Sequence, residues 1–232
     1  MTPLSSSDVV DDPQTDGGSD DEAAVEPDPR RDALLAILTE GLGDDLVESH
    51  LVGGVDLWVR VRREAWRRAA DVASTEAGCR WFDWLGAIDW LPSPFGRDME
   101  SEQDWAVHGR EEKEPVEMVT GFAGGDTRFQ VLMRLFSITS NVGVTIKTDL
   151  PDDDVSVETL IPVFAGANWH ERETHEMYGI DFVGHPDLRN LYLPGAFEGY
   201  PMRKDFPLLA RRVKPWPGIV DVEAMPGEGD DA

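Results

Sequence analysis

Two His-Glu pairs stand five residues apart in this sequence, at His170-Glu171 and His175-Glu176. In zinc proteases, two histidines four positions apart share one face of a helix, with a glutamate that acts as the base. Here the second histidine is rotated by roughly 500°, which leaves it about 140° away around a helix. Glu171 and His175 can share a face, but two ligands without a third make a poor metal site. A zinc hydrolase is therefore a distant alternative, and the sequence predicts no metal, cofactor or catalytic site.

The charges around these histidines allow two interpretations. As an exposed helix face, they would form little more than an ion pair between Arg172 and Glu176, worth tenths of a kcal/mol. At an interface, a partly buried network that also includes Glu171 and Glu173 would fix orientation more strongly. Because Trp169 and Tyr178 flank the charges, we favour the network. The stretch contains no nucleophile beside a base and no phosphate loop, so it predicts protein contact.

Further along, His185 precedes Pro186, which restricts the histidine to an extended backbone. Its imidazole can carry protons near neutral pH, or it can serve as a hydrogen-bonded structural residue, and both roles stay open. Arg203-Lys204-Asp205 lies between Pro201 and Pro207, so we expect these charges on a stiff ribbon that faces an acidic partner surface.

This part of the chain, from Trp169 to Leu208, resembles the signature of the C subunit of respiratory NADH:quinone oxidoreductase (complex I), the 30 kDa subunit family. Weaker similarity extends back to about Arg31. The family pattern usually has an aromatic residue and then Asp where His175 and Glu176 stand, and often a second basic residue at Asn190. The matching motifs are Glu171-Arg172-Glu173, Gly179-Ile180, Gly184-His185-Pro186, Leu188-Arg189 and Pro201-Met202-Arg203-Lys204-Asp205-Phe206-Pro207.

The resemblance implies a noncatalytic structural subunit in the peripheral arm of a proton-pumping translocase. It would lie at the cytoplasmic face of a bacterial plasma membrane, beside the quinone-pocket and terminal iron-sulfur subunits. FMN, iron-sulfur clusters, NADH and quinone would be bound by partner subunits and none by this chain. A membrane-bound energy-converting hydrogenase or a deazaflavin-dependent dehydrogenase with an equivalent subunit is the alternative. The expected interface residues are Trp169, Glu171, Arg172, Glu173, Tyr178, His185, Arg189, Arg203, Lys204 and Asp205.

Composition limits the partners independently. The net charge of the chain is -25. Residues 1–29 contain nine acidic residues and residues 218–232 contain five, and neither segment contains a basic residue. This balance argues against nucleic acid, which requires a basic face. No apolar run approaches the roughly 18 residues of a spanning helix, so we expect only indirect membrane contact. Cys79 is the single cysteine, which excludes an intrachain disulfide and a cluster held by this chain's thiolates alone.

Hydrophobic periodicity predicts the elements that position these residues. We expect a helix from Arg31 to Gly41, a strand at residues 55–61, and a helix at residues 62–78 with Trp66 on its apolar side. The aromatic run from Arg80 to Trp90 predicts a central strand, and residues 91–115 a surface excursion. Residues 116–122 are compatible with a strand, and residues 129–135 and 142–146 predict a hairpin.

The next segments predict two helices. Ser156 is the expected N-cap of the first, which Pro162 would interrupt. Asn168 is the expected N-cap of the second, in a capping box with Glu171, and Gly179 the expected end. The predicted fold class is therefore α+β, a mostly antiparallel sheet covered by helices, followed by a long extended C-terminal arm.

Beyond Gly179 prolines recur too often for a long helix or a central strand. The segment nevertheless keeps apolar anchors such as Leu191, Phe197 and Tyr200, which would be exposed if it hung in water. We expect it to be an arm ordered on a partner, and the alternative is that it wraps around its own domain. The predicted organisation is an acidic disordered tail at residues 1–29, an α/β body at 30–180, a partner-binding arm at 181–217 and a second acidic disordered tail at 218–232.

Overall fold

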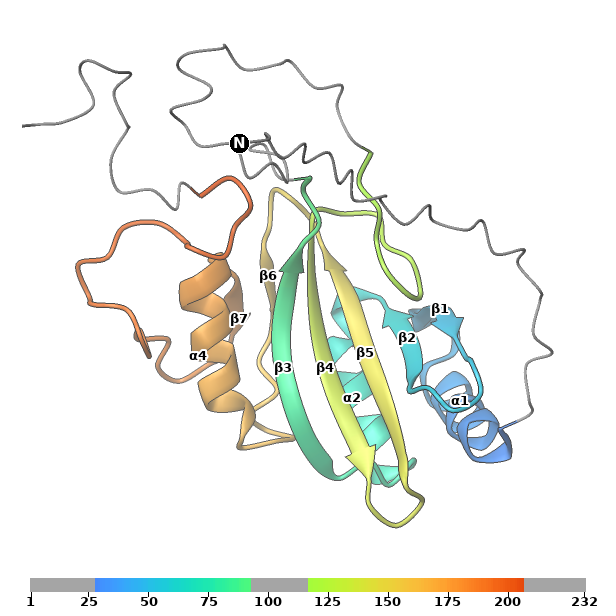
Figure 1. Ribbon diagram of the computed structural model, residues 1–232. Helices are drawn as coiled ribbons and strands as arrows, with labels where there is room; N and C mark the ends of the chain where they lie inside the picture. Colours follow the sequence, from blue (N-terminus) through green and yellow to red (C-terminus); the bar gives the residue numbers. More distant parts are fainter. Residues whose placement is uncertain (1–27, 93–116, 207–232) are drawn as a thin grey trace, which may run out of the picture.

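The computed structural model describes residues 28–92 and 117–206 (Figure 1). The tails predicted at residues 1–29 and 218–232, the excursion at 91–115 and the arm beyond residue 206 lie almost entirely outside the described residues. No helix in the described part is long and apolar enough to cross a membrane.

A five-stranded sheet forms the centre of the protein, in the order β1-β2-β5-β4-β3. β2 pairs with β5 in parallel, and the other three pairings are antiparallel. The predicted α+β class with a mostly antiparallel sheet is therefore confirmed, as is the hairpin, whose turn places Asn141 at a φ of 52°. The strands are β1 Leu46–His50, β2 Leu57–Val61, β3 Trp81–Asp89, β4 Phe129–Ser137 and β5 Val142–Leu150.

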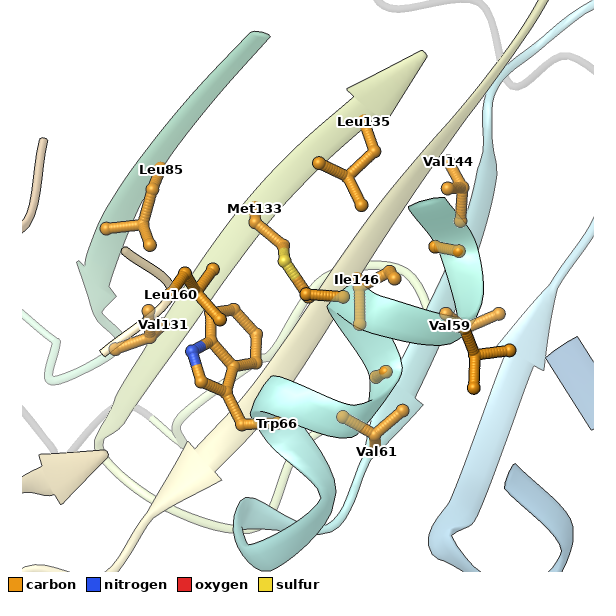
Figure 2. Close-up of a cluster of buried hydrophobic side chains, with 14 of the residues drawn as sticks. Val59, Val61, Trp66, Leu85, Val131, Met133, Leu135, Val144, Ile146 and Leu160 are labelled. Carbon is orange, nitrogen blue, oxygen red and sulfur yellow. The ribbon is translucent and has the colours of Figure 1, made fainter. Parts of the chain in front are cut away.

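Two helices cover one face of this sheet. α1 spans Pro29–Leu42 and α2 spans Trp66–Thr75, with short 3-10 turns at Gly43–Asp45 and Arg63–Ala65. Alternate residues of β2, β4 and β5 point toward α2, where Trp66 is completely buried among them (Figure 2). Burial of an aromatic side chain of this size stabilises the fold by roughly 2–3 kcal/mol. The predicted positions of these two helices are confirmed.

β3 lies at the edge of the sheet, so its predicted central position is wrong. Its aromatic residues contact a helix instead of a further strand. Phe82 packs on Phe164 and His170, with ring centroids 5.4 and 5.3 Å away, while Trp81 is 55% exposed. His170 Nδ1 also accepts a hydrogen bond from the backbone N–H of Leu85 at 3.5 Å, which partly satisfies the outer edge of β3.

The predicted strand at residues 116–122 is also wrong, because residues 117–122, the part that the structure describes, have no strand pairing. A turn with left-handed Ala123 and Gly124 follows and brings Phe122 onto His50, with ring centroids 4.4 Å apart. A short strand that the sequence pattern did not predict, β1, lies beside this turn.

A second, two-stranded sheet lies beside β3. β6 Ser156–Glu158 and β7 Asp181–Val183 pair in parallel, and helix α4 Ala167–Tyr178 connects them (Figure 1). The helix predicted to start at Ser156 is therefore wrong. Pro162 and the pairing with β7 restrict the segment, and its apolar residues Val157 and Leu160 are buried in turns and a strand.

Candidate functional site

Helix α4 carries five of the ten expected interface residues. It ends where predicted, at Gly179, whose left-handed φ of 71° lets its N–H donate to the carbonyl of His175 at 2.8 Å. At the other end the helix starts at Ala167 after Gly166. Asn168 therefore lies inside the first turn and the predicted capping box is wrong, because Glu171 accepts hydrogen bonds from another segment.

Glu171 is completely buried beneath the helix. One carboxylate oxygen accepts from the hydroxyl of Thr159 and the other from the backbone N–H of Leu160, both at 2.6 Å. These bonds fix the turn after β6 against α4. Burial raises the pKa of Glu171 to about 7, although its two hydrogen bonds favour the charged form. A carboxyl group with this pKa exchanges protons in the physiological range.

The His185 side chain is likewise completely buried, with Nε2 4.0 Å from the Glu171 carboxylate. Nδ1 accepts from the backbone N–H of Asp187 at 3.0 Å, so the hydrogen of a neutral ring is on Nε2. Nε2–H then donates to the carbonyl of Asn168 at 3.3 Å. His185 therefore connects α4 to the start of the following segment, as expected of a hydrogen-bonded structural histidine.

Arg172 and Glu176 contact the backbone of residues 189–193, and within the described residues they do not pair with each other. Arg172 donates to the carbonyls of Arg189 and Asn190 at 2.9 and 3.0 Å. The Glu176 carboxylate, which is buried, accepts from three consecutive backbone N–H groups at 2.8, 2.9 and 3.3 Å. The less favoured interpretation, an exposed helix face with an ion pair between Arg172 and Glu176, is therefore wrong, and the two side chains hold a neighbouring segment. The three N–H donors belong to Leu191, Tyr192 and Leu193.

A second attachment fixes residues 200–206. Asp89 at the end of β3 is buried and accepts two hydrogen bonds from Arg128, at 2.9 and 2.8 Å, and one from the backbone N–H of Lys204 at 2.8 Å. Burial alone would raise the pKa of Asp89, but these donors hold it below its usual value. Arg128 also pairs with Asp205 at 2.9 Å, which lowers the pKa of that carboxyl.

The side chain of Arg203 contacts its own domain. Its Nε donates to the carbonyl of Tyr178 at 2.6 Å, and its guanidinium lies 4.5 Å from the ring centroid of Tyr200 and 5.1 Å from that of Phe129. The expectation of three charges displayed on a ribbon is therefore met by Lys204, whose side chain is exposed, and only partly by Asp205. Tyr178 is half-buried, and burial raises its pKa.

Residues 184–206 thus attach through their backbone and through the side chains of His185, Arg203 and Asp205, and they leave several large apolar side chains outside. Beside them, on the first turn of α4, Trp169 borders a groove lined by Ile161, Ala165, Gly166, Asn168 and His170. Exposed apolar side chains at this density are typical of a surface that binds another protein. The exposed fractions are 67% for Trp169, 64% for Tyr192, 39% for Phe197, 37% for Tyr200 and 52% for Met202.

The two histidines of the zinc-like pattern have separate partners. His170 contacts β3, whereas His175 Nδ1 lies 2.9 Å from the carbonyl of Ile180 and 3.3 Å from the carboxylate of Asp181. Among the residues that the structure describes, no group of three His, Cys, Asp or Glu side chains is arranged to hold a metal ion.

A buried charge cluster that sequence reasoning missed lies on the sheet face opposite α2. Arg60 donates to Asp126 and Asp149 at 2.7 Å and to Glu48 at 3.1 Å. Lys147 beside it is 1% exposed, and burial lowers its pKa to about 8. The alternation of β2 and β5 assigns Arg60 and Lys147 to this face, but it does not show that they are buried.

Comparisons with known proteins assign the chain to a family. The profile of "Respiratory-chain NADH dehydrogenase, 30 Kd subunit" matches residues 59–212, more than half of the sequence. The chain belongs to this 30 kDa subunit family. The motifs between Trp169 and Leu208 therefore identify the family correctly.

Curated relatives match this chain over less than half of their own length. The NADH-quinone oxidoreductase C subunit of Methylobacterium sp. (strain 4-46) is 47% identical over 108 residues, 47% of this chain and 46% of that protein. The C subunit of Methylorubrum extorquens (strain PA1) is 52% identical over 81 residues, 35% of this chain and 36% of that protein. In Cronobacter sakazakii the match is to a C/D subunit, at 44% identity over 88 residues, 38% of this chain and 15% of that protein.

Among solved structures, a chain of the membrane-bound sulfane sulfur reductase, an archaeal respiratory membrane complex, has the same fold. Its TM-score is 0.56 at 18% identity, over 77% of this chain and 86% of that chain. A trypsin-resistant fragment of Nqo5 aligns at 22% identity with a TM-score of 0.46, over 66% of this chain and 98% of the fragment. The fold of this chain thus also occurs in an archaeal respiratory membrane complex.

Proposed function

We propose that this protein is a noncatalytic structural subunit in the peripheral arm of a proton-pumping NADH:quinone oxidoreductase. One observation supports a structural role above others. The segment after β7 is fastened to its own domain, yet its Tyr192 and Met202, and Trp169 on the neighbouring helix α4, remain more than half exposed. Side chains of this kind contribute most binding energy when they are buried against a partner.

In this proposal, the segment at residues 181–217 contacts the subunits that form the quinone pocket and carry the terminal iron-sulfur cluster. FMN, iron-sulfur clusters, NADH and quinone are bound by partner subunits. The complex lies at the cytoplasmic face of the bacterial plasma membrane, and this chain reaches the membrane only through its partners. The expected interface residues keep their roles as contacts, with three exceptions that act by supporting the surface. The side chains of Glu171 and His185 are completely buried, and Arg172 holds the backbone of Arg189 and Asn190.

The alternative is the equivalent subunit of a membrane-bound energy-converting hydrogenase or of a deazaflavin-dependent dehydrogenase. The occurrence of the same fold in an archaeal respiratory membrane complex is compatible with a parent complex of another kind. Affinity purification of the tagged chain from its native membranes, followed by mass spectrometry of the companion chains, distinguishes the two. Subunits that bind NADH and FMN should co-purify under our proposal, and hydrogenase-type subunits under the alternative.

Trp169→Ala tests the structural role. Its side chain is 67% exposed, so the purified variant should unfold within about 0.5 kcal/mol of the wild type. In a strain that lacks the native chain, the variant should reduce the amount of assembled complex and membrane NADH-to-quinone activity by the same factor. Ile138→Ala is the matched control, because it removes another exposed apolar side chain, 71% exposed, in the turn between β4 and β5 and outside the expected interface. Normal assembly with lost turnover would contradict the proposal, since it would require a chemical role.

A further inference from the structure

Residues 189–193 have a more specific role within the proposed interface, and this inference rests on the proposed function. We propose that Arg172 and Glu176 hold these residues as a preformed docking ridge. The ridge presents Arg189 and Tyr192 to a protein partner that has a carboxylate beside an apolar pocket.

Both the carbonyl groups and the N–H groups of the ridge backbone are hydrogen-bonded to α4. Arg172 takes the carbonyls of Arg189 and Asn190, and Glu176 takes the next three N–H groups. Every residue from 189 to 193 therefore has a backbone group bonded to one of two ionised side chains, which lie one helical turn apart. Hydrogen bonds to charged groups are about twice as strong as neutral ones, so these two side chains can fix a segment that has no regular secondary structure.

Two large side chains of the ridge, those of Arg189 and Tyr192, are exposed, whereas Leu191 and Leu193 are half-buried. Arg189 is 74% exposed at its side chain and pairs with Asp187, which is itself 55% exposed, at 3.1 Å. An ion pair this exposed contributes little, so Arg189 stays available for a better carboxylate. Tyr192 is 64% exposed. Arginine and tyrosine are enriched among the residues that dominate binding energy at protein interfaces. Because an arginine pairs with a carboxylate and a tyrosine ring fills an apolar pocket, the complementary partner surface has an acidic group next to an apolar pocket.

A preformed ridge binds differently from an arm that orders on its partner. When only a fraction of the free protein has the binding shape, the apparent dissociation constant rises by the inverse of that fraction. Arg172 and Glu176 are thus positioning residues, because they raise the competent fraction without touching the partner. Loosening the ridge should weaken assembly when this protein is scarce, and an excess of the protein should restore it.

Amide hydrogen exchange on the purified full-length chain tests the first half of the proposal. Glu176→Gln keeps the size of the side chain but turns an NH2 group toward three N–H donors. Exchange at Leu191, Tyr192 and Leu193 should accelerate about tenfold or more, while the amides of β4 and β5 stay protected. Glu173, which has no hydrogen bond to the described residues, provides the control Glu173→Gln. Unchanged exchange in Glu176→Gln would overturn the preformed ridge.

Complementation of a strain that lacks the native chain tests the second half. Arg189→Glu and Tyr192→Ala should each lower the assembled complex at least tenfold at native expression, and overexpression should rescue Glu176→Gln more than Arg189→Glu. Glu198→Lys is the control for a charge change at an exposed position on the same segment outside the ridge. Normal assembly of both ridge variants, with Trp169→Ala still defective, would overturn the ridge and leave the proposed function standing. Normal assembly of all three would overturn both.

Discussion

Glu171→Gln should make the protein less sensitive to pH. In the wild type the buried carboxyl accepts from Thr159 and Leu160, faces His185 Nε2 at 4.0 Å, and has no arginine or lysine within hydrogen-bonding distance among the described residues. Glutamine has the shape of the protonated acid. Its carbonyl can accept from the Leu160 N–H, and its amide can donate to the Thr159 hydroxyl oxygen. The substitution therefore removes the buried charge and keeps both contacts.

The magnitude follows from the pKa of Glu171, which burial raises from an ordinary 4.5 to about 7. Because the folded state binds this proton more tightly than the unfolded state, the contribution of the neutral acid is fully present below the unfolded pKa and is lost as pH rises through the folded pKa. The difference corresponds to about 3 kcal/mol, at about 1.4 kcal/mol for each pH unit. Between about pH 5 and pH 8, the wild type should lose roughly 2–3 kcal/mol relative to Glu171→Gln.

Urea denaturation of the two proteins at a series of pH values measures this difference directly, provided that the slope with denaturant stays constant. Glu173→Gln on the same helix is the control, and its stability should follow the wild type across the pH range. The reasoning is refuted if Glu171→Gln keeps the pH dependence of the wild type. It is also refuted if the variant is destabilised equally at both ends of the range, which would mean that the charge itself is needed.

Two further substitutions or modifications test other parts of the structure. Gly179→Ala should destabilise the protein by at least about 1–2 kcal/mol in thermal or urea unfolding, because the residue has a φ of 71° and a Cβ there would lie 2.5 Å from Tyr200 and 2.6 Å from Arg203. Gly195→Ala is the control, since a Cβ at that position meets nothing within 4 Å. Equal destabilisation by the two substitutions would contradict this reasoning. Burial raises the pKa of the Cys79 thiol to about 11. Iodoacetamide at about pH 8 should therefore alkylate this thiol slowly in the native protein and at least about tenfold faster in urea. Equal alkylation rates would show that the thiol is accessible in the native protein.

The elements that follow a simple period could be predicted from the sequence. Helix α2 places Trp66 and its alanines at helical spacing, and strands β4 and β5 place apolar residues at most alternate positions, although residues on their other face are buried as well. In these segments the local hydrophobic pattern agrees with the side that packs on the core, so the periodicity predicts both the type of element and its core-facing side. Gly179 was predictable for the same reason, since a left-handed helix end favours glycine.

The failures occur where tertiary contacts override the local pattern. Ser156 begins a helix-like apolar stripe, but its neighbours pair with β7, a strand that lies beyond helix α4. The aromatic residues of β3 indicate burial without saying whether a strand or a helix provides it. A pattern confined to one segment contains no information about its neighbour in space.

The contacts within the candidate site could not be predicted from the sequence. The types and spacing of Arg172 and Glu176 suggest an ion pair within the helix, the usual outcome for i and i+4. Their actual partners are backbone groups 15 to 18 positions away, and a backbone group has no signature in the sequence. The spacing of Glu171 from Asn168 likewise suggests a capping box, because its actual partners, Thr159 and the backbone of Leu160, cannot be inferred from the sequence.

The contact between Asp89 and the N–H of Lys204 joins positions 115 residues apart, and it orders events during synthesis. A ribosome delivers β3 long before it delivers Lys204, so the body can fold while the last attachment is still missing. A chain that terminates early keeps a buried acid short of one donor and lacks the end of the exposed segment. Under the proposed function, we expect such a truncated chain to assemble less well than the full-length chain.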